Sequence, residues 1–254
     1  MTTAVGLVVP AYRPDVDRLA AYVRALREEL APVTVRVELD APTEGVRDSL
    51  AGLPASVNAV PYRRGKGAAV TAGFEALETD VLAFADADGA TPARSLADVV
   101  ALVREGETDL AVGSRRHPKA EVATHQTFAR RYMGDIFAWV ARRLLEVDLY
   151  DYQCGAKAMA AGAWDRVREH IYEPGFAWDV ELVAVAGALD LRVTEVPVEW
   201  YDRPGSTVSP VRDSVRLARA LLGARHRAKR LRDSRLHAAI AQHREESPAL
   251  VEQK

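Results

Sequence analysis

The sequence has almost no cysteine: Cys154 is the only one among 254 residues. A single cysteine excludes an intramolecular disulfide and is consistent with a reducing compartment such as the cytoplasm. Histidine is also scarce, with six in the chain. We find no series of histidine and aspartate or asparagine that would make Cys154 a nucleophile. Its thiol is therefore interpreted as a small packed side chain.

Long apolar runs are absent as well. No uninterrupted run approaches the roughly 18–20 residues that a bilayer-spanning helix needs. The opening stretch MTTAVGLVVPAY has no basic start and only a short apolar run. It predicts a first strand rather than a signal peptide. We therefore expect a protein that is soluble or bound at a membrane surface.

The chain also lacks a large excess of either charge. Its 34 basic and 36 acidic residues give a net charge of −2, which excludes a surface built as a whole for nucleic acid. An electrostatic partner must therefore meet a local patch. A hydrophobic fraction of 48% over 254 residues is enough for the core of one large α/β domain, with or without a tail.

Strand and helix patterns alternate through the first half of the chain. The expected strands are Val5–Tyr12, Val33–Asp40, Val57–Tyr62, Asp80–Asp88 and Thr108–Arg115, and the expected helices are Asp15–Leu30, Arg63–Leu77 and Ser95–Gly106. This alternation predicts an α/β fold with a Rossmann-like, mainly parallel mixed sheet that helices cover on both faces.

The pattern changes after Arg115. The polar stretch HPKAEVATHQ predicts a mobile loop, and a helix is expected over about residues 128–145. The late strand RVTEVPVEWYDR contains Pro197, which favours an edge position. We expect one domain at residues 1–211, followed at 212–254 by a basic amphipathic helix and a frayed tail.

Two aspartates stand one residue apart at the end of a predicted strand, in LAFADADGAT. Ligands of open parallel sheets bind beyond the carboxyl ends of the strands. Asp86 and Asp88 project to the same side of an extended segment, so they repel unless a cation or a hydrogen-bond network is shared. Mg²⁺ meets this requirement, since it takes one or two carboxylates plus phosphate oxygens. The alternative is a solvated turn with a helix-capping aspartate.

A glycine-rich turn opens a predicted helix in RRGKGAAVTAG. Gly65 and Gly67 permit close backbone approach, and the helix N-terminus favours anions. Lys66 supplies a charge for phosphate or sugar hydroxyls. The pattern GxxxxGK[ST] is absent, so the turn is not a P-loop. A plain junction between a turn and a helix is the alternative.

Further polar motifs follow in the order VGSR, DYQCGAKAM, FAWDVELV and EVPVEWYDRPGSTVSP. A strand-end arginine such as Arg115 can form bidentate bonds to phosphate. Arg203 and Ser206 are donors suited to a diphosphate. Taken singly, surface arginines are solvated, and Asp179 fits an ordinary helix N-terminus.

Taken together, these motifs resemble those of the family 2 glycosyltransferases. Within that family they are most similar to the dolichyl- and polyprenyl-phosphate glucosyl- and mannosyltransferases. RRGKGAAVTAG is similar to NxGKGxAxxxG, and DYQCGAK to DxQCGxK, which is the string most specific to the glucosyltransferases. The resemblance covers the chain from Val5 to the start of the C-terminal helix. It implies a GT-A nucleotide-sugar transferase fold.

The activity that the resemblance implies is inverting, metal-dependent transfer of glucose or mannose. The donor is a UDP- or GDP-sugar and the acceptor a polyprenyl or dolichyl phosphate. Transfer onto a lipid-linked oligosaccharide or a polysaccharide is an alternative. Two others are a non-catalytic nucleotide-sugar-binding protein and a sugar nucleotidyltransferase, although PAYRPD lacks the glycine-rich loop that the last one needs.

The resemblance also implies roles for single residues. Asp88 ligates Mg²⁺ or Mn²⁺, and Asp86 contacts the metal or the donor. The implied donor-binding set is Pro10, Tyr12, Asp40, Lys66, Asp86, Ala87, Asp88, Arg203 and Ser206. The implied catalytic set is Asp86, Asp88, Arg115, Arg130, Gln153, Asp179 and Arg203.

Within the catalytic set, Arg115 and Arg130 hold the acceptor phosphate, with Arg131 as the alternative to Arg130. Asp151 and Gln153 orient sugar hydroxyls. Asp179 and Glu181 face the sugar or brace the acceptor loop, and the Arg203 loop closes over donor and metal. The sequence departs from the family at LDAP, residues 39–42, where one aspartate and a serine are missing. Asp40 still offers an acceptor to a base or ribose, while the identity of the base stays open.

The tract at residues 212–243 is rich in arginine and poor in acids. Its apolar residues Val215, Leu217, Ala218, Leu221 and Leu222 fall on or near one helical face. A basic amphipathic helix of this kind predicts peripheral binding at the cytoplasmic face of a membrane. Packing on the domain, or a dimer helix in a homo-oligomer, are the alternatives.

Overall fold

A computed structural model describes residues 3–31, 33–122, 128–201, 210–232 and 248–253. The strands are β1 (Val5–Tyr12), β2 (Val33–Asp40), β3 (Ser56–Val60), β4 (Val81–Ala85), β5 (Leu110–Ser114), β6 (Glu121–Val122), β7 (Ala156–Ala160), β8 (Val193–Pro197) and β9 (Glu199–Trp200). The helices are α1 (Val16–Glu29), α2 (Val46–Ser49), α3 (Lys66–Glu75), α4 (Ala93–Arg104), α5 (Phe128–Leu144), α6 (Ala161–Val167), α7 (Trp178–Ala188) and α8 (Pro210–Leu231), with short 3-10 turns η1 (Arg168–His170) and η2 (Leu250–Glu252).

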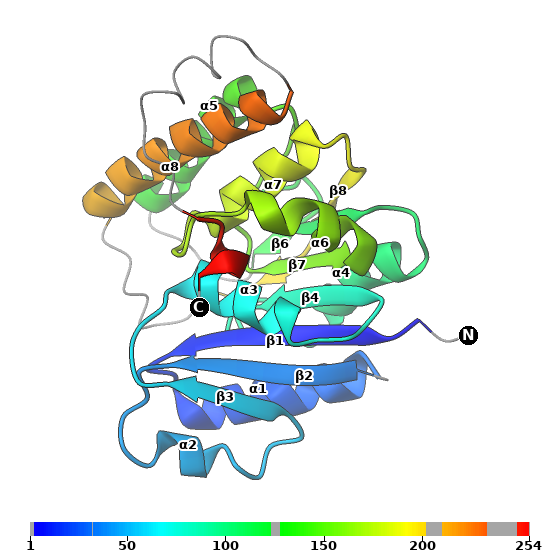
Figure 1. The fold of residues 1–254 in the computed structure, drawn as a ribbon, viewed down its shortest axis with the longest axis vertical. Coiled ribbons are helices and arrows are strands. Elements are labelled where there is room, and N and C mark those ends of the chain that lie inside the picture. The colour runs from blue at the N-terminus through cyan, green and yellow to red at the C-terminus, as the bar shows by residue number, and fades with distance from the viewer. Residues whose placement is uncertain (1–2, 32, 123–127, 202–209, 233–247, 254) are drawn as a thin grey trace.

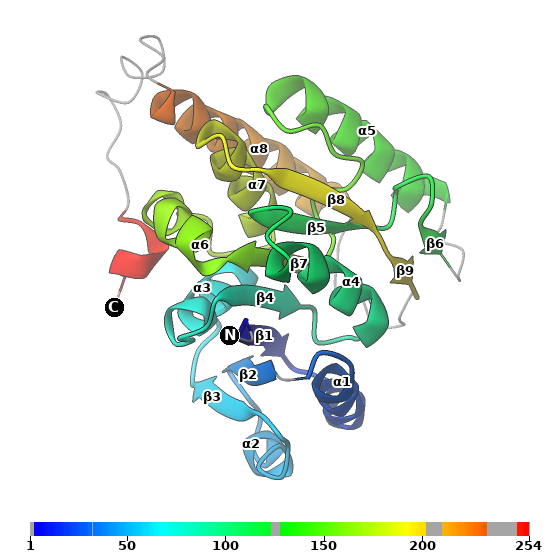
Figure 2. The same ribbon diagram turned by 90° about the vertical axis from the view of Figure 1, so that its right-hand side faces the viewer.

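Seven strands form the main sheet in the order β3-β2-β1-β4-β7-β5-β8 (Figure 2). Only β7 runs antiparallel to its neighbours in this sheet, where it pairs with β4 and β5. The predicted mainly parallel mixed sheet is confirmed. β8, which ends at Pro197, lies at an edge as the proline predicted.

Helices cover both faces of this sheet (Figure 1). Strand β1 shows how both faces are buried. Its Val5, Leu7 and Val9 belong to the hydrophobic core that includes α1 and α4. Its Val8 belongs to the core on the other face, which includes α3 and α7. Alternate residues of a parallel strand face opposite sides, so a strand buried on both sides reads as a nearly continuous apolar run. In open sheets covered in this way, ligand sites lie beyond the carboxyl ends of the strands.

The basic helix α8 packs on the domain through one face. Leu221, Ala224 and Ala228 of α8 are buried in the core that includes α7. Leu222 is 58% exposed, so the two neighbouring leucines do not share a face as the sequence had suggested. The packing alternative is therefore correct for this face. The division at residues 211/212 falls in the first turn of α8 and stays a prediction.

The chain end differs from the predicted frayed tail. Leu250 in η2 is 7% exposed, and its N–H donates to the carbonyl of Ile171 at 2.8 Å. The predicted loop after Arg115 also differs in part, because β6 pairs with β9 in a small parallel sheet. Packing between segments far apart in sequence stabilises both, and local composition does not reveal it.

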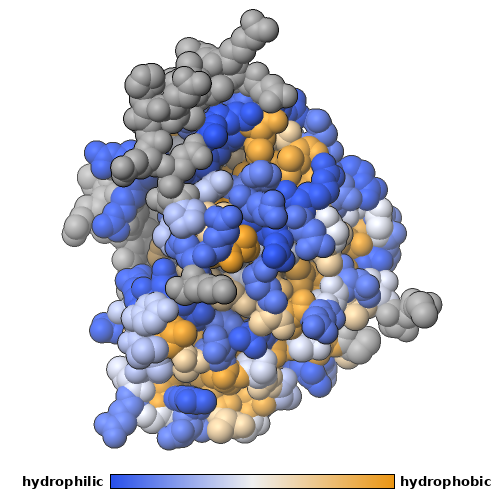
Figure 3. Space-filling model, in the orientation of Figure 1, coloured by the Kyte–Doolittle hydropathy of each residue, from blue (hydrophilic) through white to orange (hydrophobic). Residues whose placement is uncertain are grey.

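Among the described residues, no helix has an apolar stretch long enough to cross a bilayer. On the face seen in Figure 3, hydrophilic side chains are interspersed with smaller hydrophobic groups.

Candidate functional site

Several of the predicted site residues lie at the carboxyl ends of three adjacent strands. β1 pairs with β2 so that Tyr12 lies opposite Asp40, and β4 on the other side of β1 leads into Asp86. Ligands of open α/β sheets bind beyond such strand ends. The sheet thus brings together the residues that the motifs predicted separately.

The aspartate pair lies in a turn rather than on an extended segment. β4 ends at Ala85, and the N–H of Gly89 donates to the carbonyl of Asp86 at 3.3 Å. Asp88 Oδ1 accepts a hydrogen bond from the N–H of Ala90 at 2.9 Å. The argument from strand alternation therefore does not apply to this pair. Both carboxylates nevertheless reach solvent, since the Asp86 side chain is 40% exposed and Asp88 is exposed.

Gly155 holds the backbone of the next motif against Asp86. The N–H of Asp86 donates to the carbonyl of Gly155 at 2.9 Å, and a Cβ on Gly155 would overlap the Asp86 carboxylate. The glycine of DYQCGAK is therefore required by close approach to the aspartate pair.

Lys66 is the cation that faces the aspartate pair. Its Nζ lies 2.9 Å from Asp86 Oδ1 and 2.9 Å from Asp179 Oδ2, and its side chain is 8% exposed. Burial disfavours the charged form, but the carboxylates of Asp179 and Asp86 outweigh burial and raise the pKa of Lys66. The lysine is held as an ammonium ion beside the strand end.

The glycines around Lys66 serve a different contact from the predicted one. Gly65 has a φ of 102°, and a Cβ on it would overlap the carbonyl of Pro174. A Cβ on Gly67 would overlap the carbonyl of Glu173 and the side chain of Trp178. The close approach at this turn is made by the chain's own 173–175 segment, which accepts a hydrogen bond from the N–H of Ala68 at 3.1 Å.

Asp179 lies inside the protein. It stands in the first turn of α7, and its side chain is 1% exposed. Its second oxygen, Oδ1, lies 2.7 Å from Lys157 Nζ. Burial raises the pKa of Asp179, but Lys157 and Lys66 outweigh it, so the pKa is below its usual value. Its side chain thus contacts these two lysines, and its predicted role at the sugar or the acceptor loop stays a prediction.

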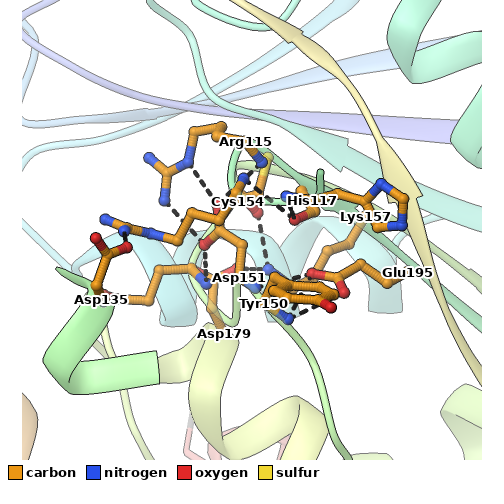
Figure 4. A network of polar contacts seen from close by, with 12 residues as sticks. Arg115, His117, Asp135, Tyr150, Asp151, Cys154, Lys157, Asp179 and Glu195 are labelled. Carbon is orange, nitrogen blue, oxygen red and sulfur yellow. Dashed lines mark hydrogen bonds and ion pairs between the residues drawn. The ribbon is translucent and has the colours of Figure 1, made fainter. Parts of the chain in front are cut away.

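Arg115 is clamped by Asp151 (Figure 4). Its Nε and Nη2 donate to the two carboxylate oxygens at 2.7 and 3.0 Å, and its backbone N–H donates to Oδ2 at 3.2 Å. Burial raises the pKa of Asp151, yet the guanidinium outweighs it and lowers the pKa to about 2. Asp151 is 2% exposed, so its carboxylate holds Arg115 in place. The sequence had suggested a contact between Asp151 and a sugar hydroxyl instead.

The other residues of this motif are placed by the same turn. The N–H of Gln153 donates to Asp151 Oδ1 at 3.0 Å, and Gln153 is partly exposed. Cys154 is fully buried, and burial raises the pKa of its thiol to about 11. A protonated, buried thiol is a packed side chain, as predicted, and not a nucleophile.

Asp40 caps the turn that carries Lys66. Its Oδ2 accepts from the N–H groups of Arg64 and Gly65 at 2.8 and 2.9 Å, and its Oδ1 accepts from Arg64 Nε at 2.8 Å. At 2% exposure the carboxylate faces these partners rather than solvent. Its predicted contact with a base or ribose stays a prediction.

Three donor-binding candidates from β1 and the β4 turn reach the surface. Tyr12 is 37% exposed, and the guanidinium of Arg63 lies 4.2 Å from its ring centroid. Pro10 and Ala87 are partly exposed. A cation–π contact is thus present at this edge, beside the predicted position of the base.

Some predicted residues cannot be placed fully. Arg203 and Ser206 lie outside the described residues, as does the side chain of Arg130, whose backbone belongs to the first turn of α5. Tyr201, the last described residue before Arg203, lies near the aspartate pair, because its N–H donates to the carbonyl of Ala90 at 2.9 Å.

The carboxylates of Asp86 and Asp88 suit a hard metal cation that takes its other ligands from a bound molecule. Among the residues described, no three His, Cys, Asp or Glu side chains gather as a metal cluster. Asp86 and Asp88 supply the carboxylate oxygens that Mg²⁺ and Mn²⁺ prefer. These two residues fit an ion that completes its coordination on a diphosphate.

Lys157 is the last residue of the DYQCGAK motif, but no role was predicted for it from the sequence. It is the single charge in the strand AKAMA, in which an isolated lysine reads as a solvent-facing residue of an edge. Its complete burial comes from the central place of β7 in the sheet. Its place at the end of DYQCGAK is the signal that the sequence offers.

Comparison with known sequences bears on this geometry. The sequence model of Glycosyl transferase family 2 matches residues 7–147. Glycosyltransferase AglD of Haloferax volcanii is 34% identical over 160 residues, which are 63% of this chain and 25% of that protein. The dolichyl-phosphate beta-glucosyltransferase of Mus musculus is 31% identical over 173 residues, or 65% of this chain and 52% of the relative. The chain thus spans about half or less of these relatives.

Solved structures show the fold. Glucosyl-3-phosphoglycerate synthase from Mycobacterium tuberculosis, in complex with Mn²⁺, UDP-glucose and phosphoglyceric acid, has a TM-score of 0.67 at 16% identity and covers 88% of this chain and 80% of its own. Mannosyl-3-phosphoglycerate synthase from Rubrobacter xylanophilus has a TM-score of 0.68 at 18% identity, over 91% and 75%. The sheet and its helices therefore form the GT-A fold.

Proposed function

The chain belongs to glycosyl transferase family 2, and from this premise we propose that it is an inverting, metal-dependent hexosyltransferase. It moves glucose or mannose from a UDP- or GDP-sugar to a polyprenyl or dolichyl phosphate. The names of relatives such as the dolichyl-phosphate beta-glucosyltransferases support a lipid phosphate acceptor. The Mn²⁺ and UDP-glucose of the structural neighbour support the choice of metal and donor.

The observation that carries this proposal is the ion pair between Lys66 and Asp86, 2.9 Å apart beyond the end of β4. A nucleotide-sugar donor brings a diphosphate that needs positive charge. Lys66 supplies part of this charge, and Arg203 and Ser206 are proposed to supply hydrogen-bond donors. Mg²⁺ or Mn²⁺ held by Asp88 and Asp86 would polarise the diphosphate and stabilise it as a leaving group.

The nucleoside is proposed to lie along β1. Pro10 and Tyr12 line its path, and Ala87 lies in the β4 turn beside it. Asp40 acts on the donor through the turn that it caps, because its oxygens are occupied by Arg64 and Gly65.

The acceptor phosphate is proposed to bind between Arg115 and Arg130. Asp151 occupies Nε and Nη2 of Arg115. Nη1 is then the part of the guanidinium that meets a phosphate oxygen, in a fixed orientation. Gln153 is placed by the same turn to orient a sugar hydroxyl.

The chemistry needs little proton transfer. A phosphate monoester is already an anion at pH 7, with a second pKa of about 6. One of its oxygens attacks the anomeric carbon, and the bond from that carbon to the donor diphosphate breaks with its electron pair. Fixed positive groups at the leaving side stabilise the charge that develops there. A single displacement inverts the anomeric centre.

A lipid acceptor requires a surface that meets the membrane, and we place it on α5 and α8. Ile136 and Trp139 of α5 are 47% and 53% exposed, and the guanidinium of Arg143 lies 4.9 Å from the Trp139 ring centroid. Leu222 of α8 is 58% exposed. We call these four residues the α5–α8 surface. Apolar side chains beside arginine suit a bilayer interface that carries anionic lipids.

A donor and acceptor panel tests the proposal. Labelled UDP-glucose, UDP-galactose, GDP-mannose and GDP-glucose are each incubated with Mn²⁺ and either a polyprenyl phosphate or 3-phosphoglycerate. We expect one hexose to enter the lipid phase with polyprenyl phosphate, and chelation of the metal to stop its transfer. Asp88→Ala is expected to lower the rate about a hundredfold or more, a loss of roughly 3 kcal/mol of transition-state stabilisation.

Other outcomes of the panel would contradict the proposal. Transfer to 3-phosphoglycerate alone would remove the lipid acceptor. Full activity of Asp88→Ala would remove the metal role, since this surface substitution changes no core volume.

A further inference from the structure

Lys157 is a buried cation that the reaction described above does not use. Its side chain is 1% exposed. Nζ lies 2.7 Å from Asp179 Oδ1 and donates to the carbonyl of Cys154 at 2.8 Å. An ammonium group is very costly to remove from water unless it is paired and hydrogen-bonded, so its position in the centre of the sheet calls for a reason.

A chain of ion pairs leads from Lys157 to the strand end. Asp179 contacts Lys157 through one oxygen and Lys66 through the other, and Lys66 contacts Asp86. The exposed fraction rises along this path, from 1% for Lys157 and Asp179 to 8% for Lys66 and 40% for Asp86. We call these four residues the buried ion chain. It connects the interior with the group proposed to hold the metal.

The two lysines of the buried ion chain contact the same aromatic ring. Lys157 lies opposite Phe84 in the register of β4 and β7. Lys66 Nζ and Lys157 Nζ lie 4.9 and 5.7 Å from the Phe84 ring centroid, and Trp178 packs edge-on against the same ring at 5.5 Å. The strand that leads into Asp86 therefore also fixes the two lysines.

The charges in the ion chain balance, with two cations and two carboxylates. Without Lys157, the buried ion chain would keep Lys66 as its single cation, and both Asp179 and Asp86 would pair with it. Asp179 is the more deeply buried carboxylate, so it would compete most strongly for Lys66. The ammonium group would then be drawn inward, away from the strand end.

We propose that Lys157 is a positioning residue for donor binding, which acts through Asp179 to keep Lys66 at Asp86 and available to the donor diphosphate. The inference rests on the donor half of the proposed function and deepens it. It does not depend on which acceptor receives the sugar.

Lys157→Met tests the proposal, because methionine has similar length and no charge. Binding of UDP-glucose and of GDP-mannose in the presence of Mn²⁺ is measured by titration calorimetry, without acceptor. For the nucleotide-sugar that the wild type binds, we expect the dissociation constant to rise about tenfold or more. Thermal unfolding is followed in parallel to establish that the variant is folded.

The double variant Lys157→Met/Asp179→Asn separates positioning from simple support of the fold. Asparagine removes the buried charge that would draw Lys66 inward. We expect the second substitution to restore the dissociation constant to within about threefold of the wild type, a coupling that a double-mutant cycle reports directly. Two independent structural lesions would instead add.

Arg227→Met is the matched control. It removes the cation that pairs with Glu181, another carboxylate of 1% exposure, which stands outside the ion chain. We expect lower thermal stability and a donor dissociation constant within about twofold of the wild type.

Two results would overturn the proposal: a folded Lys157→Met that binds donor like the wild type, or a folded double variant that binds it tenfold more weakly. If Lys157→Met does not fold, the double variant, which has neither buried charge, decides. Because these measurements need no acceptor, a failure to glycosylate polyprenyl phosphate would contradict the proposed function and leave this inference intact.

Discussion

Asp151 fixes the orientation of the Arg115 side chain. Two of its contacts go to the guanidinium of Arg115 and one to the backbone N–H of the same residue. Its own backbone is held by Glu195, which accepts the N–H groups of Tyr150 and Asp151 at 2.8 to 3.0 Å. The entropy of ordering the arginine is thus lost on folding, and a phosphate that binds it later does not have to provide it.

The stability that Asp151 contributes depends on pH in a defined direction. Its folded pKa of about 2 is below its ordinary value of 3.8, so the contribution is complete above the ordinary pKa and is lost as pH falls toward 2. We expect Asp151→Asn to lower the free energy of unfolding by about 2 kcal/mol at pH 7, with the difference from the wild type shrinking between about pH 4 and pH 2. Urea unfolding at several pH values measures this.

Asp148→Asn serves as the control for that series. Asp148 pairs with Arg142 at 3.7 Å, and its side chain is 87% exposed. Such a surface pair is screened by water and contributes little. A difference for Asp151→Asn that stays constant down to pH 2 would contradict the assigned cause.

At the scale of elements, α8 is connected to the glycine-rich turn at the start of α3. Arg227 of α8 pairs with Glu181 of α7. Glu181 accepts the N–H groups of Tyr172 and Glu173 at 2.8 and 2.7 Å. The segment that follows packs on the turn before Lys66. Arg227 pairs with Oε1 of Glu181, whereas both N–H groups donate to Oε2, so α8 contacts this connection without supplying the hydrogen bonds that hold the donor side of the site.

The outward face of α5 predicts membrane binding. Ile136, Trp139 and Arg143 are spaced for one side of a helix, and Arg225 of α8 donates to the carbonyl of Leu144 at 3.0 Å, which places the two helices side by side. We expect Trp139→Ala to reduce flotation with phosphatidylcholine vesicles containing phosphatidylglycerol about tenfold, and added salt to weaken wild-type binding.

Tyr62→Ala is the matched control for this experiment. Tyr62 is a similarly exposed aromatic residue, at 62%, and it follows β3 on the far side of the sheet. We expect this variant to float like the wild type. Equal flotation of Trp139→Ala and the wild type would remove the α5–α8 surface from the account.

At the scale of the whole molecule, local pattern predicted the layers, and tertiary contacts decided the rest. The alternation of strands and helices up to Arg115 is a property of hydrophobic period, so the sheet and its two covered faces were predictable. The antiparallel direction of β7 was not predictable, because it depends on how the chain after α5 re-enters the sheet between β4 and β5. The position of β7 inside the sheet also buries Lys157 and brings Asp151 to Arg115.

The candidate site shows the same division. Asp86, Asp88, Lys66 and Arg115 were found because strand ends and a glycine-rich turn mark them in the sequence. The pairings of these residues were not predicted, since an ion pair between residues 113 positions apart, such as Lys66 and Asp179, leaves no local signal. The reason for Gly65 also needed the fold, because the contact that excludes a side chain there comes from Pro174.

The central claim is direct transfer of a hexose to a lipid phosphate. The most direct test is the anomeric configuration of the product made from an α-linked donor, UDP-glucose or GDP-mannose, and polyprenyl phosphate, determined by NMR of the purified glycolipid. The account predicts a β-linked hexosyl phosphate, formed in one inverting displacement. An α-linked product, or release of free sugar with no glycolipid, would contradict it.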